Sequence, residues 1–132
     1  MNRNEARAVI MTILYQIFIY QKENITYNID EVIKENLTVD NEFVKSMVTN
    51  IIEKKEELFK IANDNLKDWK MSRLGITDQA ILCMGIYELL YTDTPSVVAI
   101  NEAVELAKKY SDDKVKNMIN GVLDKIYHEK IQ

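Results

Sequence analysis

The sequence of 132 residues contains few residues that break or crosslink a chain: three glycines, one proline and one cysteine. This scarcity excludes collagen-like, low-complexity and disulfide-stapled classes. The lone Cys83 fits a reducing compartment, and we predict a cytoplasmic protein. With 47% hydrophobic residues, the chain has the length and composition of one domain that folds without a metal or a disulfide.

Residues that enzymes use for catalysis are equally scarce. The single histidine, His128, lies near the C-terminal end, and Cys83 lies in the most apolar helical segment, where a buried thiol is inert. There is no glycine-rich phosphate loop and no cysteine and histidine cluster at metal-ligand spacing. The acidic pairs at 56–57 and 112–113 are typical of helix surfaces and caps. We therefore predict no catalytic residue, metal site, cofactor or enzymatic activity.

No hydrophobic run is long enough to cross a membrane. The most apolar stretch, residues 9–20, is interrupted by Thr12, Tyr15 and Gln16, and it falls short of the roughly 18 to 20 residues that span a bilayer. Glu5 in the position of a basic leader segment argues against a secretory signal. We expect no membrane association.

Apolar residues recur at three- and four-residue spacing, which predicts an all-helical domain. Asp40 and Thr77 are expected to cap two of the helices, because both residue types favour that position. The first segment is rich in β-branched residues, which leaves a strand as its alternative. The expected helices cover residues 4–22, 30–35, 40–65, 77–90 and 98–110, and a last helix begins at 111–113.

Charge is unevenly distributed along the chain, although its net value is only −4. Residues 1–22 and 108–116 each carry a net charge of +2, whereas residues 23–72 and 73–107 each carry −4. An acidic whole excludes a protein that coats nucleic acid over its entire surface, but it allows a local basic patch. If the two basic segments are neighbours in the fold, they form one such patch.

Tyr15 and Tyr110 accompany these basic segments. Lysines that contact phosphates, together with aromatic rings on which unpaired bases stack, are the requirements for binding single-stranded RNA. The same residues also fit an ordinary solvated face with tyrosines at the edge of the core. Composition alone favours that plainer interpretation.

Four blocks of sequence change this balance. They read VVAINEAVELAK at residues 97–108, NGVLDK at 120–125, AIL at 80–82 and YEL at 87–89. Together with Arg7 and Tyr15, their order and spacing closely resemble the NusB family of bacterial transcription antitermination factors. The resemblance implies an all-α fold of six to seven helices in two three-helix subdomains that share a core, divided here at about residues 1–66 and 67–132. It also implies no catalytic activity.

The resemblance further implies an RNA-binding adaptor. Family members pair with NusE, a ribosomal protein, bind the boxA element of ribosomal RNA leaders, and join RNA polymerase so that it passes terminators. Arg7, Tyr15 and Tyr110 match family positions that contact RNA, and Asp78 matches an acidic partner-binding position. The RNA face that we expect consists of Arg3, Arg7, Tyr15, Lys108, Tyr110, Lys114 and Lys116.

The chain departs from the family pattern in two places. Met118 stands where the family usually has a phenylalanine, which removes one possible stacking ring. The N-terminus has only Arg3 and Arg7 in place of the dense arginine cluster of some members. We expect weaker RNA affinity without the partner, because fewer phosphates are neutralised.

Several alternatives stay open. The chain is also compatible with a helical adaptor that binds only protein, or with the RNA-binding fragment of a ribosomal RNA methyltransferase that carries this domain. Homodimerisation is a separate possibility. We interpret Gly85 and Gly121 as close helix contacts, Trp69 as a core or inter-subdomain anchor, and Glu102 as a residue that pins helices together.

Overall fold

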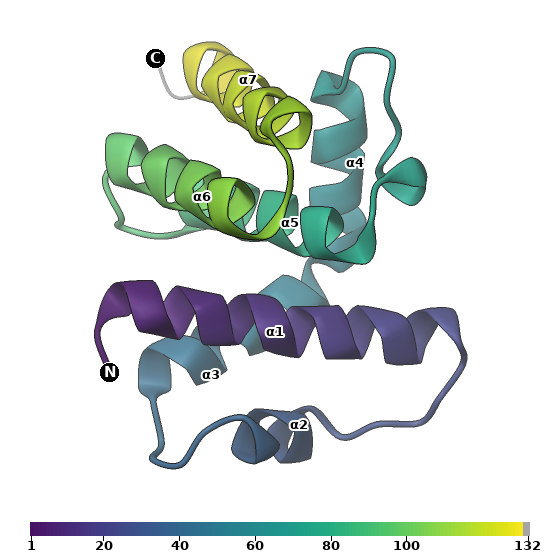
Figure 1. Cartoon of the computed structure of the whole chain (residues 1–132), viewed down its shortest axis with the longest axis vertical. Helices are drawn as coiled ribbons and strands as arrows, with labels where there is room; N and C mark the ends of the chain where they lie inside the picture. Colours follow the sequence, from purple (N-terminus) through teal and green to yellow (C-terminus); the bar gives the residue numbers. More distant parts are fainter. Residues whose placement is uncertain (131–132) are drawn as a thin grey trace.

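The computed structural model describes residues 1–130, which form seven α-helices and one short 3-10 helix (Figure 1). The elements are α1 (Arg3–Lys22), α2 (Ile29–Glu35), α3 (Glu42–Glu53), α4 (Lys55–Asn65), η1 (Met71–Arg73), α5 (Ile76–Tyr91), α6 (Ser96–Tyr110) and α7 (Asp113–Lys130). The all-helical prediction is confirmed, and the strand alternative for the first segment is wrong. Across residues 1–130, no helix combines the length and the apolar character that a membrane span requires.

Side-chain caps start the helices of the N-terminal half. Asn2, Asn28 and Asn41 precede α1, α2 and α3, and each accepts the backbone N–H of the residue three positions later at 2.8–3.0 Å. The cap that we predicted at Asp40 is therefore wrong, because the neighbouring Asn41 takes that role. At the other end of the chain, Asp112 caps α7 in the same way at 2.8 Å, within the range 111–113 where we predicted that the last helix begins.

The single long helix predicted over residues 40–65 is wrong, because it is two helices that meet at Lys54. The hydrogen bonds on either side of the bend are kept: Lys54 N–H donates to the Asn50 carbonyl at 3.0 Å, and its own carbonyl accepts from Leu58 N–H at 2.8 Å. No proline or glycine marks the position. Since α3 packs on α1 while α4 packs on α5 and α7, tertiary packing sets the bend.

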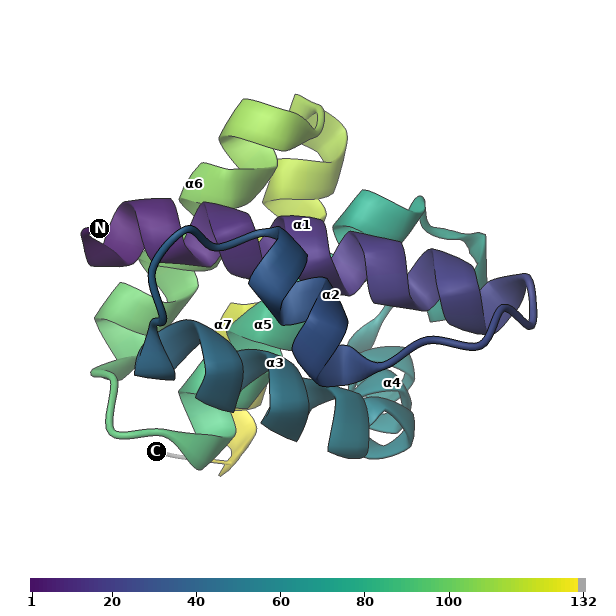
Figure 2. The same ribbon diagram turned by 90° about the horizontal axis from the view of Figure 1, so that it is seen from below.

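α5 is the central helix (Figures 1 and 2). Every residue from 79 to 89 is buried, and the helix contacts α1, α3, α4, α6 and α7. A helix that is apolar nearly all round is expected at the centre of a domain, where neighbouring helices cover every face of it. The N-cap prediction at Thr77 is wrong: Gly75 precedes the helix, Thr77 lies in its first turn, and no side chain caps it.

The two glycines that we interpreted as close contacts behave differently. A Cβ on Gly85 would lie 2.8 Å from Leu123 Cδ1 and 3.1 Å from Ala103 Cβ, so α5 approaches α6 and α7 too closely there for a side chain. A Cβ on Gly121 would meet nothing within 4 Å. The prediction is confirmed for Gly85 and wrong for Gly121.

α1 lies between two groups of helices (Figure 1). α2 and α3 pack on one side of it, and α5 packs on the other, followed by α4, α6 and α7. Figure 2 shows α2 in front of α1 when the molecule is seen from below. The division into subdomains at about residue 66 stays a prediction; α4, which precedes that position, packs with α5 and α7.

Candidate nucleic-acid interface

Arg7, which we predicted to contact RNA, is buried inside the fold. Its side chain is 6% exposed, and its Nε and Nη2 donate to the two carboxylate oxygens of Glu88 at 2.7 and 2.8 Å. Glu102 lies 3.9 Å from its Nη1, as the interpretation of Glu102 as a pinning residue requires. The hydrogen bond to Glu88 raises the pKa of the guanidinium against the opposing effect of burial. Arg7 therefore joins α1 to α5, and the structure does not support an RNA contact there.

Arg3 is exposed, but it contacts α3 and not the C-terminal basic segment. Its guanidinium carbon lies 3.7 Å from the centroid of the Phe43 ring, and that of Arg7 lies 5.5 Å from the same ring. This geometry is a cation–π contact. The N-terminal arginines thus face α3 and α5, and they do not contribute to the basic patch expected from the charge pattern.

The two segments themselves are neighbours, since a groove of about 470 Å³ runs between the start of α1 and the end of α6. The groove is lined by Asn4, Ala8, Glu102, Glu105, Leu106, Lys108, Lys109 and Tyr110. Tyr110 is 42% exposed, and Lys109 Nζ lies 5.4 Å from its ring centroid. Lys108 and Lys109 at the end of α6 supply the positive charge of the groove, and Glu102 and Glu105, earlier in the same helix, supply negative charge.

Lys109 belongs to this site although the predicted RNA face omitted it. Its place between Lys108 and Tyr110 in the basic segment is the signal that identifies it. Glu105 is the second omission, and it lies one turn before Lys109 on the same helix.

Tyr15 continues the same face of α1. It is 42% exposed, and helical periodicity places it in line with Asn4 and Ala8, which line the groove. α1 runs antiparallel to α5, because Arg7 pairs with Glu88 near one end, while residues 18–22 of α1 line a pocket with residues 75–79 at the other end. Tyr15, in the second half of α1, therefore lies toward the end of the molecule where α5 begins.

Asp78, the predicted partner-binding residue, lies at that end against the turn between α6 and α7. Burial raises the pKa of the Asp78 carboxyl, a hydrogen bond with the Ser111 side chain lowers it, and the nearby Asp112 raises it again. The net pKa is above its ordinary value. The predicted partner position and the predicted RNA residue Tyr110 are thus next to each other, a juxtaposition that the sequence does not reveal.

The last two lysines of the predicted RNA face stand at the start of α7. Lys114 is exposed, and its Nζ lies 5.1 Å from the ring centroid of Trp69. Lys116 is partly buried, with its Nζ 3.8 Å from Asp113. Trp69 is partly buried and packs against the edge of the core, where it connects the segment between α4 and α5 with Lys114 of α7. Of the predicted core or inter-subdomain anchor, the structure therefore shows a ring at the edge of the core.

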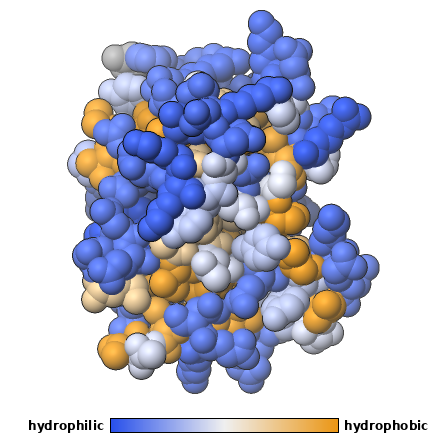
Figure 3. Space-filling view, viewed as in Figure 1, coloured by the Kyte–Doolittle hydropathy of each residue, from blue (hydrophilic) through white to orange (hydrophobic). Residues whose placement is uncertain are grey.

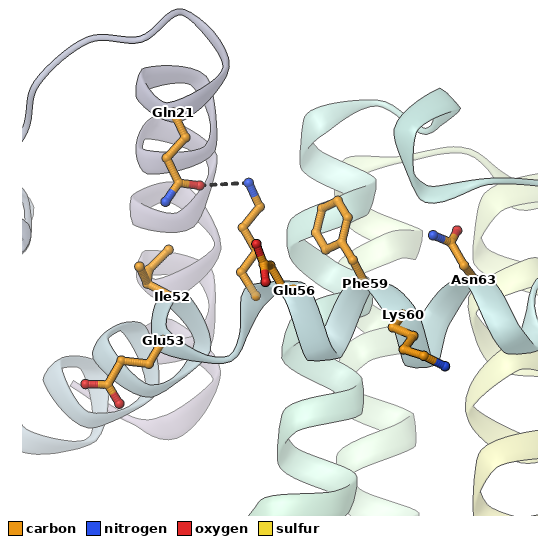
Figure 4. A pocket seen from close by; sticks show the side chains of 8 residues that line it. Gln21, Ile52, Glu53, Glu56, Phe59, Lys60 and Asn63 are labelled. Carbon is orange, nitrogen blue, oxygen red and sulfur yellow. Dashed lines mark hydrogen bonds between the residues drawn. The ribbon is translucent and has the colours of Figure 1, made fainter.

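A second cavity, of about 850 Å³, lies between α1 and the bend of α3 and α4 (Figure 4). Lys55 Nζ donates to Gln21 Oε1 at 2.7 Å, and it lies 4.4 and 5.2 Å from the ring centroids of Phe18 and Phe59. Burial lowers the pKa of Lys55. Among residues 1–130 there is no group of three acidic, histidine or cysteine side chains that fits a metal ion.

Hydrophilic side chains cover most of the face of the molecule seen in Figure 3, and the apolar residues on it are scattered. The fold and the site define an all-helical domain with an open groove that is lined by lysines and an exposed tyrosine. The family model for the NusB family matches residues 4–128. The chain therefore belongs to the NusB family, and its curated relatives are transcription antitermination proteins.

Relatives and solved structures agree with this assignment. The transcription antitermination protein NusB of Staphylococcus carnosus (strain TM300) is 41% identical over 130 residues, which cover 96% of this chain and 99% of that one. NusB of T. maritima has a TM-score of 0.86 at 27% identity, over 98% of this chain and 92% of that one. A chain from a complex of antitermination factors NusB and NusE with double-stranded RNA has a TM-score of 0.79 at 27% identity, with 96% of each chain covered.

Proposed function

We propose that this chain is an RNA-binding transcription antitermination factor. In this proposal it pairs with the ribosomal protein NusE, binds boxA-type single-stranded RNA of ribosomal RNA leaders, and joins elongating RNA polymerase in the bacterial cytoplasm. Membership of the NusB family supports the role in antitermination. The similar chain in complex with NusE and double-stranded RNA supports a paired mode of RNA binding.

The observation that carries the proposal is the groove between α1 and α6, with its exposed tyrosines and lysines. Lys108, Lys109 and Tyr110 line it, and Tyr15 extends the same face along α1. Lysines supply salt-sensitive attraction to phosphates, and tyrosine rings stack on unpaired bases whatever their sequence. Base preference then comes from hydrogen bonds to the bases that are splayed out.

The geometry changes the set of residues that we assign to RNA. We retain Tyr15, Lys108, Tyr110, Lys114 and Lys116, and we add Lys109 because it lines the groove. Arg7 leaves the set, since both of its donor nitrogens that face Glu88 are occupied. Arg3 is exposed, but its guanidinium lies over the ring of Phe43 and has to leave that ring before it can contact a phosphate.

Asp78 is the residue that we assign to the protein partner. It carries a carboxylate at a position where burial and Asp112 already disfavour negative charge. A basic group of the ribosomal protein would relieve both effects, which is electrostatic complementarity of the kind that selects partners. Because Asp78 adjoins Ser111, the bound partner would lie beside the RNA face.

The test is fluorescence anisotropy of a labelled boxA-like RNA, titrated with this protein in the presence and absence of the ribosomal partner. Two salt concentrations and a matched double-stranded RNA complete the design. We expect tighter, salt-sensitive binding of the single-stranded RNA when the partner is present. Absence of RNA binding under every condition would favour the protein-only adaptor. Sedimentation velocity of the same samples reports whether the free protein forms a homodimer.

Tyr15→Ala provides the residue-level test. We expect it to weaken RNA binding by roughly 1 to 3 kcal/mol, because one base loses its stacking partner. The melting temperature should change little, since the ring is 42% exposed. Tyr27→Ala is a control on the other side of α1, where the tyrosine stacks with Tyr20. Equal losses of RNA affinity in both variants would remove Tyr15 from the site.

A further inference from the structure

The connector between α4 and α5 carries a second group of basic and aromatic residues that the charge pattern of the sequence conceals. Residues 66–75 contain Lys67, Lys70 and Arg73 against the single acid Asp68. All four side chains are exposed. This local excess of positive charge disappears when the connector is counted with the acidic helices on either side of it.

Packing brings the connector next to the start of α7. Trp69 is partly buried, and Lys114 Nζ lies 5.1 Å from its ring centroid. α4, which leads into the connector, packs against α7. Lys114 is therefore a member of the α6–α7 basic segment and also a contact of the connector.

The connector is held in place by hydrogen bonds. Met71 N–H donates to Asn63 Oδ1 at 2.8 Å, and the buried Gln79 amide donates to the carbonyls of Met71 and Leu74 at 2.8 and 3.2 Å. Asp68 takes a left-handed conformation with φ 63°, which turns the chain just before Trp69. Lys67 and Lys70 thus lie close to Trp69 along a backbone that is already ordered, and little backbone ordering is needed for them to bind a ligand.

The two segments meet at Trp69 and Lys114, and both are basic although the protein is acidic. Residues 66–75 and 108–116 hold seven basic residues against three acidic ones, although the whole chain has a net charge of −4. Each segment contains an aromatic ring, Trp69 in the first and Tyr110 in the second. Positive charge interleaved with aromatic rings is the pattern of a path for single-stranded nucleic acid.

We propose that the α4–α5 connector extends the RNA-binding face beyond the α6–α7 turn, with Lys67 and Lys70 contacting phosphates and Trp69 stacking on a base that flanks the main element. This inference rests on the proposed RNA-binding function and adds a second contact region to it. Lys114 connects the regions, since its Nζ can move from the indole ring to a phosphate. The site favours RNA over a protein partner because its exposed charged groups are three cations against one acid, in a segment that also carries an aromatic ring.

Trp69 makes the site directly observable, because it is the only tryptophan in the chain. The probes are a boxA-like single-stranded RNA of about 12 nucleotides and the same RNA extended by about six nucleotides at either end, lengths that suit single-strand sites. Binding is measured by anisotropy at several salt concentrations, and tryptophan fluorescence is recorded in the same titrations. We expect one of the extended RNAs to bind about fivefold or more tightly and to change the Trp69 emission.

The test variant is Lys67→Gln/Lys70→Gln, and the matched control is Lys34→Gln/Lys45→Gln. The control removes the same charge from exposed lysines of α2 and α3, on the other side of α1 (Figure 1). In the test variant, the gain from the extension should disappear, and the slope of log affinity against log salt should become shallower by about 1.4. The short RNA should bind the test variant and the control alike.

Each outcome decides the proposal. If the short RNA binds but the extension adds nothing, or if the test variant keeps the gain, the connector is not an RNA contact and the proposed function stands. If no RNA binds at all, the proposed function and this inference fail together. If the test variant binds RNA normally but loses the ribosomal partner, the connector is a protein surface and the inference is wrong.

Discussion

Breaking the ion pair of Arg7 and Glu88 tests whether Arg7 has a structural role or contacts RNA. Both side chains are at most 6% exposed, and two hydrogen bonds of 2.7 and 2.8 Å join them. Removing one partner of such a buried pair costs about 3–5 kcal/mol, because the other charge is left without compensation. For a domain of this size, that loss lowers the melting temperature by about 12–20 °C.

The direct comparison is Arg7→Met, Glu88→Leu and the double variant, measured by urea unfolding under circular dichroism. Each single variant should lose about 3–5 kcal/mol, whereas the double variant should lose much less than the sum, since apolar side chains replace both charges. The loss of stability in Glu88→Leu should lie toward the lower end of this range, because Glu102, 3.9 Å from Arg7 Nη1, still compensates part of the arginine charge.

A loss of less than about 1 kcal/mol of stability in either single variant, or two losses that simply add in the double variant, would contradict a structural role of the Arg7–Glu88 pair. RNA affinity supplies the second readout. Folded Arg7→Met, at low temperature, should bind RNA as the unmodified protein does. A large loss of RNA affinity with unchanged stability would restore Arg7 to the RNA-binding set.

Three further predictions follow from single side chains. Gly85→Ala should destabilise the fold by about 1–2 kcal/mol, because its methyl group overlaps Leu123. Gly121→Ala should stabilise the fold by up to about 1 kcal/mol, because nothing lies within 4 Å of the added methyl group and alanine favours a helix. Thermal melts that show no difference between the two variants would contradict this prediction. The pKa of Asp78 is raised in the folded protein, so its negative charge lowers stability at any pH above that pKa. Asp78→Asn should therefore unfold at a higher urea concentration at neutral pH, lose this advantage as the pH falls below the ordinary pKa of 3.8, and bind the ribosomal partner more weakly. An advantage in stability that grows in acid would contradict the prediction. Burial raises the pKa of Cys83 to about 12, so a thiol reagent should label it only after unfolding, and rapid labelling of the native protein would place the thiol at the surface.

The helices were largely predictable because their signals are local. Apolar spacing predicted α1, α2 and α6 to within about two residues at their ends, and the predicted start of the last helix at 111–113 includes Asp113, where α7 begins. The failures occurred where a choice between neighbours was not local. Asn41 caps α3 in place of Asp40, and the bend at Lys54 has no breaker in the sequence.

The site was predictable in part. The basic segment with Tyr110 was recognised from its composition, and the groove beside α1 agrees with that interpretation. Arg7 was assigned to RNA from its match to a family position, and the sequence alone does not distinguish a buried arginine on the first helix from one that faces solvent. Glu88 lies 81 positions away along the chain, so the pair becomes visible only after folding.

The helical class, the central position of α5 and the family can be predicted from the chain alone, because periodicity, apolar content and the order of short blocks are local properties. Which charges are available to a ligand depends on how the helices pack. Burial satisfies Arg7 with Glu88, and packing turns the connector with Trp69 toward Lys114. The physical reason is that electrostatic partners are chosen by distance in space, and helix packing sets that distance between residues far apart in the chain.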